Sequence, residues 1–341
     1  MKRQKVLNSQ GEEILLNQRE TMVANHVQRQ VNALGYEIDI TTLTTIMKKI
    51  TEQKFFEIAP ADYIPVRVGE GAWSSNLVTY RSFALADDFS TGVINTGSNN
   101  GRLAVGDAGV DSVTIAVKNW AKSIGWTLFD LQEAAKSGNW DLVTAKERSR
   151  KKNWDLGIQK VAFLGMDGDS AVKGLLNLSG VNNNVSVITK TISSMTDAEL
   201  STFLGAILPA YRTNCSRTAM PTHFVIPESD YLGLAVPTSA TFPLKSKLQL
   251  IEEVFKIMTK NPNFKVLPCA YGDESSYFGG SGNIRYALYN DAEETIRMDI
   301  PVDYTNTLAN SIDNFSFQNV GYGQFTGVGV YRPAEVLYFT H

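Results

Sequence analysis

The chain has 341 residues, of which 43% are hydrophobic and 20% are charged, and its formal net charge is −3. A chain of this length buries roughly three quarters of its unfolded surface, and its length predicts about two domains. The small net charge gives no overall sign of a nucleic-acid-binding protein. There is no run of about 18 apolar residues and no apolar signal-peptide core, so we expect no membrane association and use in a cytoplasm.

The first part of the chain combines a polar arm with an extended hairpin. Residues 1–30 are polar and rich in Gln and Asn, so they are expected to be ordered only against another surface. Apolar spacing predicts a helix over residues 41–53. Residues 72–85 alternate between two faces, and residues 113–117 do so again after a Gly-rich polar stretch. This pattern predicts a long hairpin, which is poorly stable alone and normally lies against a partner.

A long basic helix is expected next. Residues 126–138 (WTLFDLQEAAKSG) predict a strand that leads into a short helix. The segment 141–164 then predicts a helix of roughly 35 Å, at about 1.5 Å per residue. Asp141 suits its first turn and Gly165 suits its end. The positions expected to form a buried stripe in its second half are Trp154, Gly157, Ile158, Val161 and Leu164.

The second half of the chain mixes helices and strands, which is typical of an α+β module over about residues 190–310. Thr196 and Glu199 form a capping box that should begin a helix, and apolar spacing continues this helix to Tyr211. The other expected elements are strands at 185–188, 223–226, 264–267, 284–289, 328–331 and 336–339, and helices over 228–235 and 246–259.

This order of elements, with two motif regions, resembles the major capsid proteins of tailed bacteriophages. Their Hong-Kong-ninety-seven-type fold is shared with encapsulin shells. Asp130 is a mild departure, because the family commonly has Glu there. The segments that carry the resemblance are the start at 126–138, the long helix, GMDG (165–168) followed by KGLLN (173–177), Ile300-Pro301, and GVGVYRP (327–333).

The resemblance implies a fold class and a domain organisation. The fold is α+β, a phage major capsid fold with an N-terminal arm, an extended β-hairpin loop, a peripheral domain with a long spine helix, and an axial domain. The implied bounds are 1–55 for the arm, 66–112 for the extended loop, 190–310 for the axial domain, and 56–65, 113–189 and 311–341 for the peripheral domain, with the spine helix at about 141–164.

The same resemblance implies a structural protein without enzymatic activity and without a cofactor. Copies would assemble as pentamers and hexamers into the icosahedral shell of a virion capsid, formed in the cytoplasm of a bacterial host. Expected partners are further copies of the chain, a portal protein, possibly scaffold or decoration proteins, and packaged double-stranded DNA, bound non-specifically. The long amino-terminal scaffolding segment of some relatives is absent, so a separate scaffold protein, or none, is expected.

Two groups of residues are candidates for contacts in such a shell. A basic face on the long helix could meet DNA or a neighbouring subunit, although a solvated face paired with nearby carboxylates is the simpler interpretation. Aromatic residues of the extended loop could anchor it on a neighbour. The basic residues are Lys146, Arg148, Arg150, Lys151 and Lys152, and the loop anchors are Trp73, Tyr80, Phe83 and Phe89.

The extended loop lacks a residue that some relatives use for covalent cross-linking. The resemblance implies that such relatives join a loop lysine to an asparagine of a neighbouring subunit. This chain has no lysine between Lys54 and Lys118. The loop offers only arginines, whose guanidinium stays protonated and cannot act as the nucleophile. We therefore expect a shell held by non-covalent contacts.

Two other functions are alternatives to the phage capsid. An encapsulin-like nanocompartment would share the fold, and an α+β hydrolase or carbohydrate-binding protein would belong to a different class. The sequence offers little for catalysis: three histidines without a shared site, a charged run interpreted as a solvated loop, and two cysteines without metal spacing that are expected to be buried, reduced thiols. These residues are His26, His223 and His341; Asp291, Glu293 and Glu294; and Cys215 and Cys269.

Overall fold

The computed structural model describes most of the chain from residue 54 onward. The described residues are 4–7, 13–16, 54–85, 107–136, 141–237, 245–278, 280, 282–313 and 315–341. The chain forms two compact units, Met1–Lys54 and Phe55–His341. In the first unit, β1 (Gln4–Leu7) and β2 (Glu13–Leu16) form an antiparallel hairpin. The helix expected over residues 41–53 lies outside the described residues.

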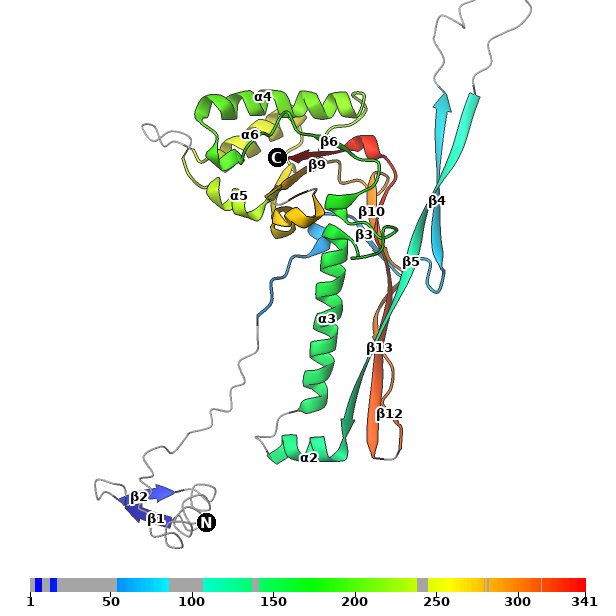
Figure 1. The fold of residues 1–341 in the computed structure, drawn as a ribbon, viewed down its shortest axis with the longest axis vertical. Helices are drawn as coiled ribbons and strands as arrows, with labels where there is room; N and C mark the ends of the chain where they lie inside the picture. Colours follow the sequence, from blue (N-terminus) through cyan, green and yellow to red (C-terminus); the bar gives the residue numbers. More distant parts are fainter. Residues whose placement is uncertain are drawn as a thin grey trace, which may run out of the picture. The chain divides into compact units, whose positions relative to one another are not determined.

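The predicted long hairpin is present as β4 (Asn76–Leu85) and β5 (Asp107–Thr127). Strand β5 has 21 residues and is much longer than the expected strand at 113–117. Its first half pairs with β4, and its second half pairs with β13 (Ser316–Thr326). The sheet continues to β11 (Val302–Asn306), in the order β11-β13-β5-β4, and the short β12 (Asn310–Ser311) also pairs with β13 (Figure 1).

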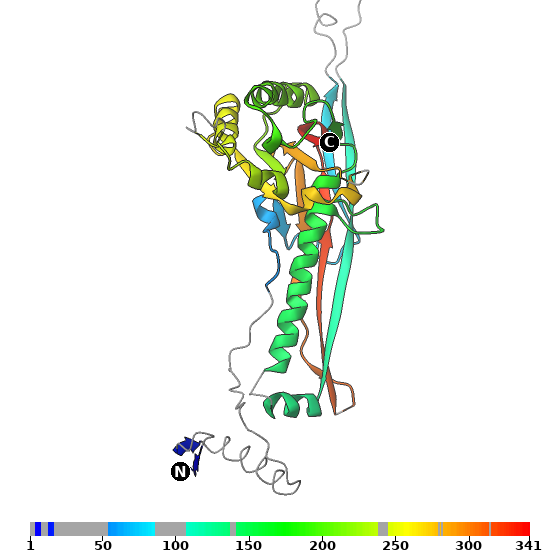
Figure 2. The same ribbon diagram turned by 60° about the vertical axis from the view of Figure 1, so that its left-hand side comes forward.

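The predicted spine helix is α3 (Leu142–Leu164), which follows the short α2 (Leu128–Lys136). The Asp141 carboxylate accepts a hydrogen bond from the backbone N–H of Thr144 and caps the start of α3. Gly165 ends the helix with φ at 83°, and a Cβ there would lie 2.4 Å from the carbonyl oxygen of Val172, so only glycine fits. Figures 1 and 2 show α3 running alongside β5 and β13.

A five-stranded mixed sheet lies beyond the carboxyl end of α3. Its order is β6 (Asn182–Asn184), β15 (Val336–Thr340), β9 (Arg285–Tyr289), β7 (His223–Pro227) and β8 (Lys265–Cys269). The strand expected at 185–188 is wrong by a few residues: β6 precedes it, and Val185 is exposed because the chain has already left the sheet.

Three helices lie between β6 and β8 in chain order: α4 (Asp197–Asn214), α5 (Glu228–Gly233) and α6 (Lys247–Thr259). The capping box of Thr196 and Glu199 is formed at the start of α4, as predicted. Ser246 and Gln249 form a second one at the start of α6. Local capping and apolar periodicity therefore account for α4 and α6.

A small three-stranded sheet joins the two larger ones. Its order is β14 (Val328–Val330), β10 (Ile296–Ile300) and β3 (Val66–Val68), and β3 pairs with β10 in parallel. The sequence pattern predicted neither β10 nor the paired strands β11 and β13. The short 3₁₀ helices are η1 (Pro60–Asp62), η3 (Leu175–Asn177), η4 (Ile192–Ser194), η5 (Ala270–Asp273), η6 (Ser275–Tyr277) and η7 (Pro333–Glu335).

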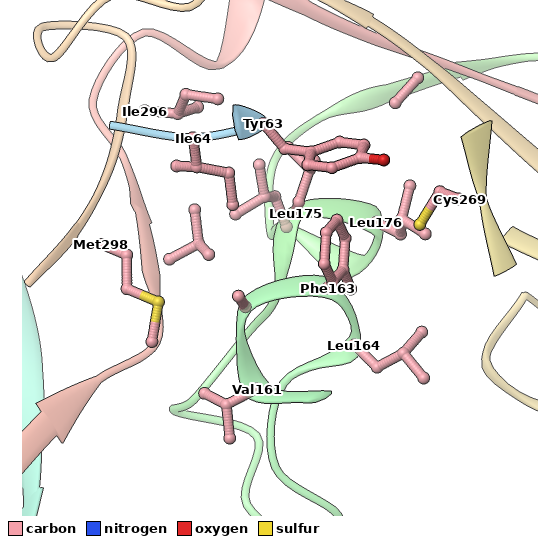
Figure 3. Packing of buried hydrophobic residues seen from close by; sticks show 14 of the residues in the cluster. Tyr63, Ile64, Val161, Phe163, Leu164, Leu175, Leu176, Cys269, Ile296 and Met298 are labelled. Atoms are coloured by element: carbon pink, nitrogen blue, oxygen red, sulfur yellow. The ribbon is translucent and has the colours of Figure 1, made fainter. Parts of the chain in front are cut away.

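The five-stranded sheet separates two hydrophobic cores because successive side chains of a strand point to opposite faces. On β9, Tyr286 and Leu288 pack with α4 and α6, whereas Ala287 and Tyr289 pack towards the end of α3. Figure 3 shows the second of these cores, where Phe163 of α3 meets side chains that include Tyr63, Ile64, Leu175, Leu176 and Cys269.

Burial follows most of the sequence predictions. In the expected stripe of α3, Trp154, Ile158, Val161 and Leu164 are buried, and only Gly157 is exposed. Both cysteines are buried and unpaired, as predicted. Among the described residues, no helix is long and apolar enough to span a membrane, and no cluster of three or more His, Cys, Asp or Glu side chains could hold a metal ion.

Candidate assembly surfaces

The two faces of the β4–β5 ribbon differ sharply in burial. One face contains Leu77 and Thr79 opposite Ile115 and Val113, and it is at least partly buried. The Thr79 hydroxyl accepts a hydrogen bond from Arg297 of β10, at 3.3 Å. This face is therefore fixed to the rest of the second unit.

The opposite face of the ribbon carries exposed apolar side chains. It contains Val78, Tyr80 and Val110, and Tyr80 is 75% exposed. The exposed Tyr80 is consistent with its predicted use as a loop anchor. Of the other predicted anchors, Phe89 lies outside the described residues, and the side chain of Phe83 is not described. The ribbon thus presents an apolar stripe that nothing in the described chain covers.

The outer edge of β4 is a second exposed feature of the ribbon. Strand β4 is the last in its sheet, and no other strand of the described residues pairs with that edge. A strand of 10 residues leaves a row of backbone N–H and C=O groups there. Such an edge is normally covered or blocked, because it can pair with another chain.

Trp73 is exposed on a strained turn just before β4. Its φ is 65°, a left-handed value that is costly for a bulky side chain. The backbone N–H of Trp73 donates to Gln324 Oε1 at 2.8 Å, and the Gln324 amide donates to Asn119 Oδ1 at 2.6 Å. Gln324 is buried and fixed by both bonds. The turn therefore fixes the backbone of Trp73, while the residue is 71% exposed and its ring centroid lies 6.0 Å from that of Tyr322.

A second exposed apolar group lies at the far end of β5 and β13 from the ribbon (Figure 1). Leu308 is 88% exposed, and the rings of Phe129 and Phe315 contact each other at 5.1 Å. Sequence reasoning missed this group, although isolated apolar residues within a polar turn are a recognisable signal. We call it the tip patch, and its residues are Leu128, Phe129, Leu308, Ile312 and Phe315.

Arg150 does not belong to an exposed basic face, and that prediction is wrong. Its side chain is only 2% exposed, and it projects from α3 into the sheet. The guanidinium donates to Tyr304 Oη at 2.8 Å, to the carbonyl oxygen and Oδ1 of Asn319 at 2.9 and 2.8 Å, and to Asn306 Oδ1 at 3.1 Å. A Cβ on Gly321 would lie 2.7 Å from Arg150 Nε, so glycine makes room for the guanidinium.

The other four basic residues of the predicted face divide into two pairs. Lys146 donates to the carbonyl oxygen of Gly125 at 2.8 Å, and Lys152 forms an ion pair with Glu57. Both therefore help to fix α3 to neighbouring segments, which agrees in part with the simpler interpretation. Arg148 and Lys151 are the two exposed cations of this set.

Comparison with known proteins agrees with this geometry. A family described as Major capsid protein matches residues 95–341. The chain belongs to the major capsid protein family. No curated protein sequence matches it significantly.

Solved capsid structures share the fold of this capsid protein. The capsid of Myoviridae phage XM1 matches with a TM-score of 0.73 at 17% identity, covering 90% of this chain and 99% of that one. Mycobacterium phage Ogopogo matches with a TM-score of 0.55 at 8% identity, covering 91% and 98%. A native GTA particle capsid matches with a TM-score of 0.51 at 14% identity, covering 91% and 98%.

These matches confirm the predicted phage capsid fold and a structural, shell-forming role in a capsid. The hydrolase and carbohydrate-binding alternatives are not supported, and the encapsulin alternative is weaker. The charged run divides: Glu293 and Glu294 are exposed, as predicted, whereas the Asp291 side chain is only 25% exposed and lies beside the buried His223.

Proposed function

We propose that copies of this capsid protein assemble as pentamers and hexamers into an icosahedral shell around double-stranded DNA, in the cytoplasm of a bacterial host. Family membership supports self-assembly. The observation that carries the rest is exposed apolar surface at three separate places along the long sheet. Tyr80 lies on the ribbon, where β4 pairs with the first half of β5, and Trp73 lies near mid-length, beside Gln324 and Tyr322 of β13. The tip patch lies at the far end of β5 and β13.

Several separate contact surfaces on one subunit are what a closed shell requires. Each subunit must contact more than one neighbour, and symmetry repeats every contact many times. Individual contacts can be weak, because the subunit is held by several of them at once. We propose that the apolar stripe of the ribbon and Trp73 meet one neighbouring copy, and that the tip patch meets another.

The proposed domain organisation follows the implied scheme with two adjustments. The arm is 1–55, the extended loop is 66–112, and the spine helix lies in the peripheral domain. The sheet topology favours ending the axial domain near residue 290 rather than at 310, because β10 and β11 pair with β3, β14 and β13. It also favours assigning β15 to the axial sheet, since β15 pairs with β6 and β9.

The further proposed partners are packaged DNA, a portal protein, and scaffold or decoration proteins. Arg148 and Lys151 are the exposed cations of α3 that could contact DNA phosphates non-specifically. Contact with a neighbouring subunit is the alternative role for these two residues. Either role would involve a smaller basic face than the sequence predicted, since Arg150 is buried.

The shell should be held together without covalent cross-links. Particles of the full-length protein, collected by sedimentation, should release monomers of 37.6 kDa when boiled in detergent. The reason is that residues 55–117 contain no lysine, so the loop has no nucleophilic amine. A ladder of detergent-resistant oligomers would contradict the non-covalent shell. A failure to find any rapidly sedimenting particle, at any protein concentration, would contradict self-assembly itself.

A further inference from the structure

Two buried polar atoms lack hydrogen-bond partners in the described part of the chain: His223 Nε2 and Asp291 Oδ1. The two side chains face each other, with 3.7 Å between His223 Nε2 and Asp291 Oδ2. This separation is too long for a hydrogen bond, yet the side chains are only 6% and 25% exposed. Buried polar groups are almost always paired, so this arrangement calls for a physical explanation.

The pair lies where the five-stranded sheet connects to the three-stranded sheet. His223 is the first residue of β7, and Asp291 lies in the segment between β9 and β10. Thr222 joins the two: its hydroxyl oxygen accepts the Asp291 backbone N–H at 2.7 Å and lies 3.0 Å from His223 Nδ1. Its own backbone N–H donates to the carbonyl oxygen of Tyr289 at 2.9 Å. The pair therefore closes the corner between two sheets.

Burial and the neighbouring residues shift the pKa values of both members of the pair. Lys265 of β8 is the register partner of His223 on one side, and Tyr289 of β9 stacks on its ring from the other at 5.7 Å. Burial raises the pKa of Asp291 to about 6, against a weaker opposing effect of Lys265. Burial, reinforced by Lys265, lowers the pKa of His223 to about 4. Between these values the pair gains one proton relative to a neutral histidine and an ionised carboxylate.

We propose that His223 and Asp291 form a proton-binding latch at this corner, closed when the pair takes up a single proton from mildly acidic solution. The proton joins His223 Nε2 to an Asp291 oxygen, either as imidazolium and carboxylate or as neutral imidazole and carboxylic acid. In both forms the proton lies between the two side chains, so that His223 Nε2 and the Asp291 carboxyl group are joined by a hydrogen bond. The latch tightens the segment from Asn290 to Thr295, and it does not depend on the proposed shell.

Proton binding by Asp291 and by His223 has opposite effects on the free energy of unfolding of the chain. Asp291 has a raised pKa in the folded chain, so it adds stability as pH falls from about 6 towards its ordinary 3.8. His223 has a lowered pKa, so it removes stability as pH falls from its ordinary 6.5 towards about 4. The two effects nearly offset in the wild-type chain. The variant Asp291→Asn should therefore lose stability on acidification from pH 6.5 to 4, relative to wild type.

Hydrogen exchange of the full-length, unassembled protein tests the latch directly. When the segment from Asn290 to Thr295 opens while His223 stays buried, only the raised pKa of Asp291 contributes. After correction for the intrinsic effect of pH, protection of the Asp291 amide should therefore be about tenfold higher at pH 5 than at pH 7.5. The isosteric variant Asp291→Asn should show no such change. Equal protection at the two pH values in wild type, or the same increase in the variant, would overturn the proposal.

A second measurement keeps the test independent of how the variant folds. The chain has three histidines, so ring signals of ¹³C-labelled wild-type histidine can be followed through a pH titration. The His223 signals should change near pH 6, when the pair takes up its first proton, and again near pH 4. A single transition at the ordinary histidine pKa of 6.5 would overturn the latch.

Discussion

Arg150→Gln is expected to lower the free energy of unfolding of the subunit by about 3 kcal/mol. The arginine is almost fully buried, and its guanidinium connects α3 to β13 and to the segment that contains Tyr304 and Asn306. Glutamine is shorter and offers fewer donors. It would leave the Asn319 carbonyl and the Tyr304 hydroxyl without their present partner in a site that water does not reach freely.

Urea unfolding of the unassembled protein, followed by far-UV circular dichroism, measures this effect. Lys151→Gln is the matched control, because it removes a neighbouring charge that is exposed, and it should change stability by less than about 0.5 kcal/mol. Equal stability losses in the two variants would contradict the structural role of Arg150. The control also tests the proposed DNA contact, since unchanged DNA content in Lys151→Gln particles would argue against it.

Trp73→Ala is expected to raise the protein concentration needed for assembly at least about tenfold, while the subunit keeps its fold. Exposed tryptophans are frequent energetic centres of protein interfaces. The backbone of this one is held in a strained conformation by the buried Gln324, so little backbone freedom is left to lose on binding. Light scattering against protein concentration gives the threshold.

Two further variants distinguish loss of the Trp73 ring contact from relief of its strained backbone conformation. Trp73→Gly relieves the strained φ and removes the ring, so it should assemble as poorly as Trp73→Ala while the subunit is no less stable than wild type. Ile257→Ala removes a side chain of α6 that is 75% exposed and should leave the threshold unchanged. If Trp73→Ala assembled like wild type, the anchor role of Trp73 would be wrong.

Local signals in the sequence were sufficient for the helices. The spine helix was predicted within a residue of α3, because Asp141 caps its start and Gly165 ends it. The α4 helix follows from its capping box and apolar spacing in the same way. The strands of the five-stranded sheet, β6 apart, were found because their buried apolar runs are short and bounded by turns.

The long sheet could not be predicted in full, because its partners are distant in sequence. Strand β13 pairs with β5 about 200 residues earlier, and it carries Gly321 and Gly323, which weaken any strand pattern. Those glycines are needed because Arg150 and the Trp154 ring occupy the space above them. Neither reason is visible until α3 is placed on the sheet.

The candidate surfaces were predicted only in part, for the same physical reason. Tyr80 and Trp73 could be selected as aromatic residues of a loop that needs a partner. The burial of Arg150 could not be predicted, because its acceptors come from three separate segments near residues 122, 305 and 319. The tip patch combines the start of α2 with residues 308–315, which surround β12, so only the fold brings its two segments together.

A cryo-electron microscopy reconstruction of particles assembled from the purified full-length protein tests self-assembly through these surfaces most directly. We predict closed shells in which Trp73 and the exposed face of β4 are buried against one neighbouring copy, and the tip patch against another. Shells in which these side chains face solvent would contradict the assigned surfaces. Preparations that contain only single subunits under all conditions would contradict the account as a whole.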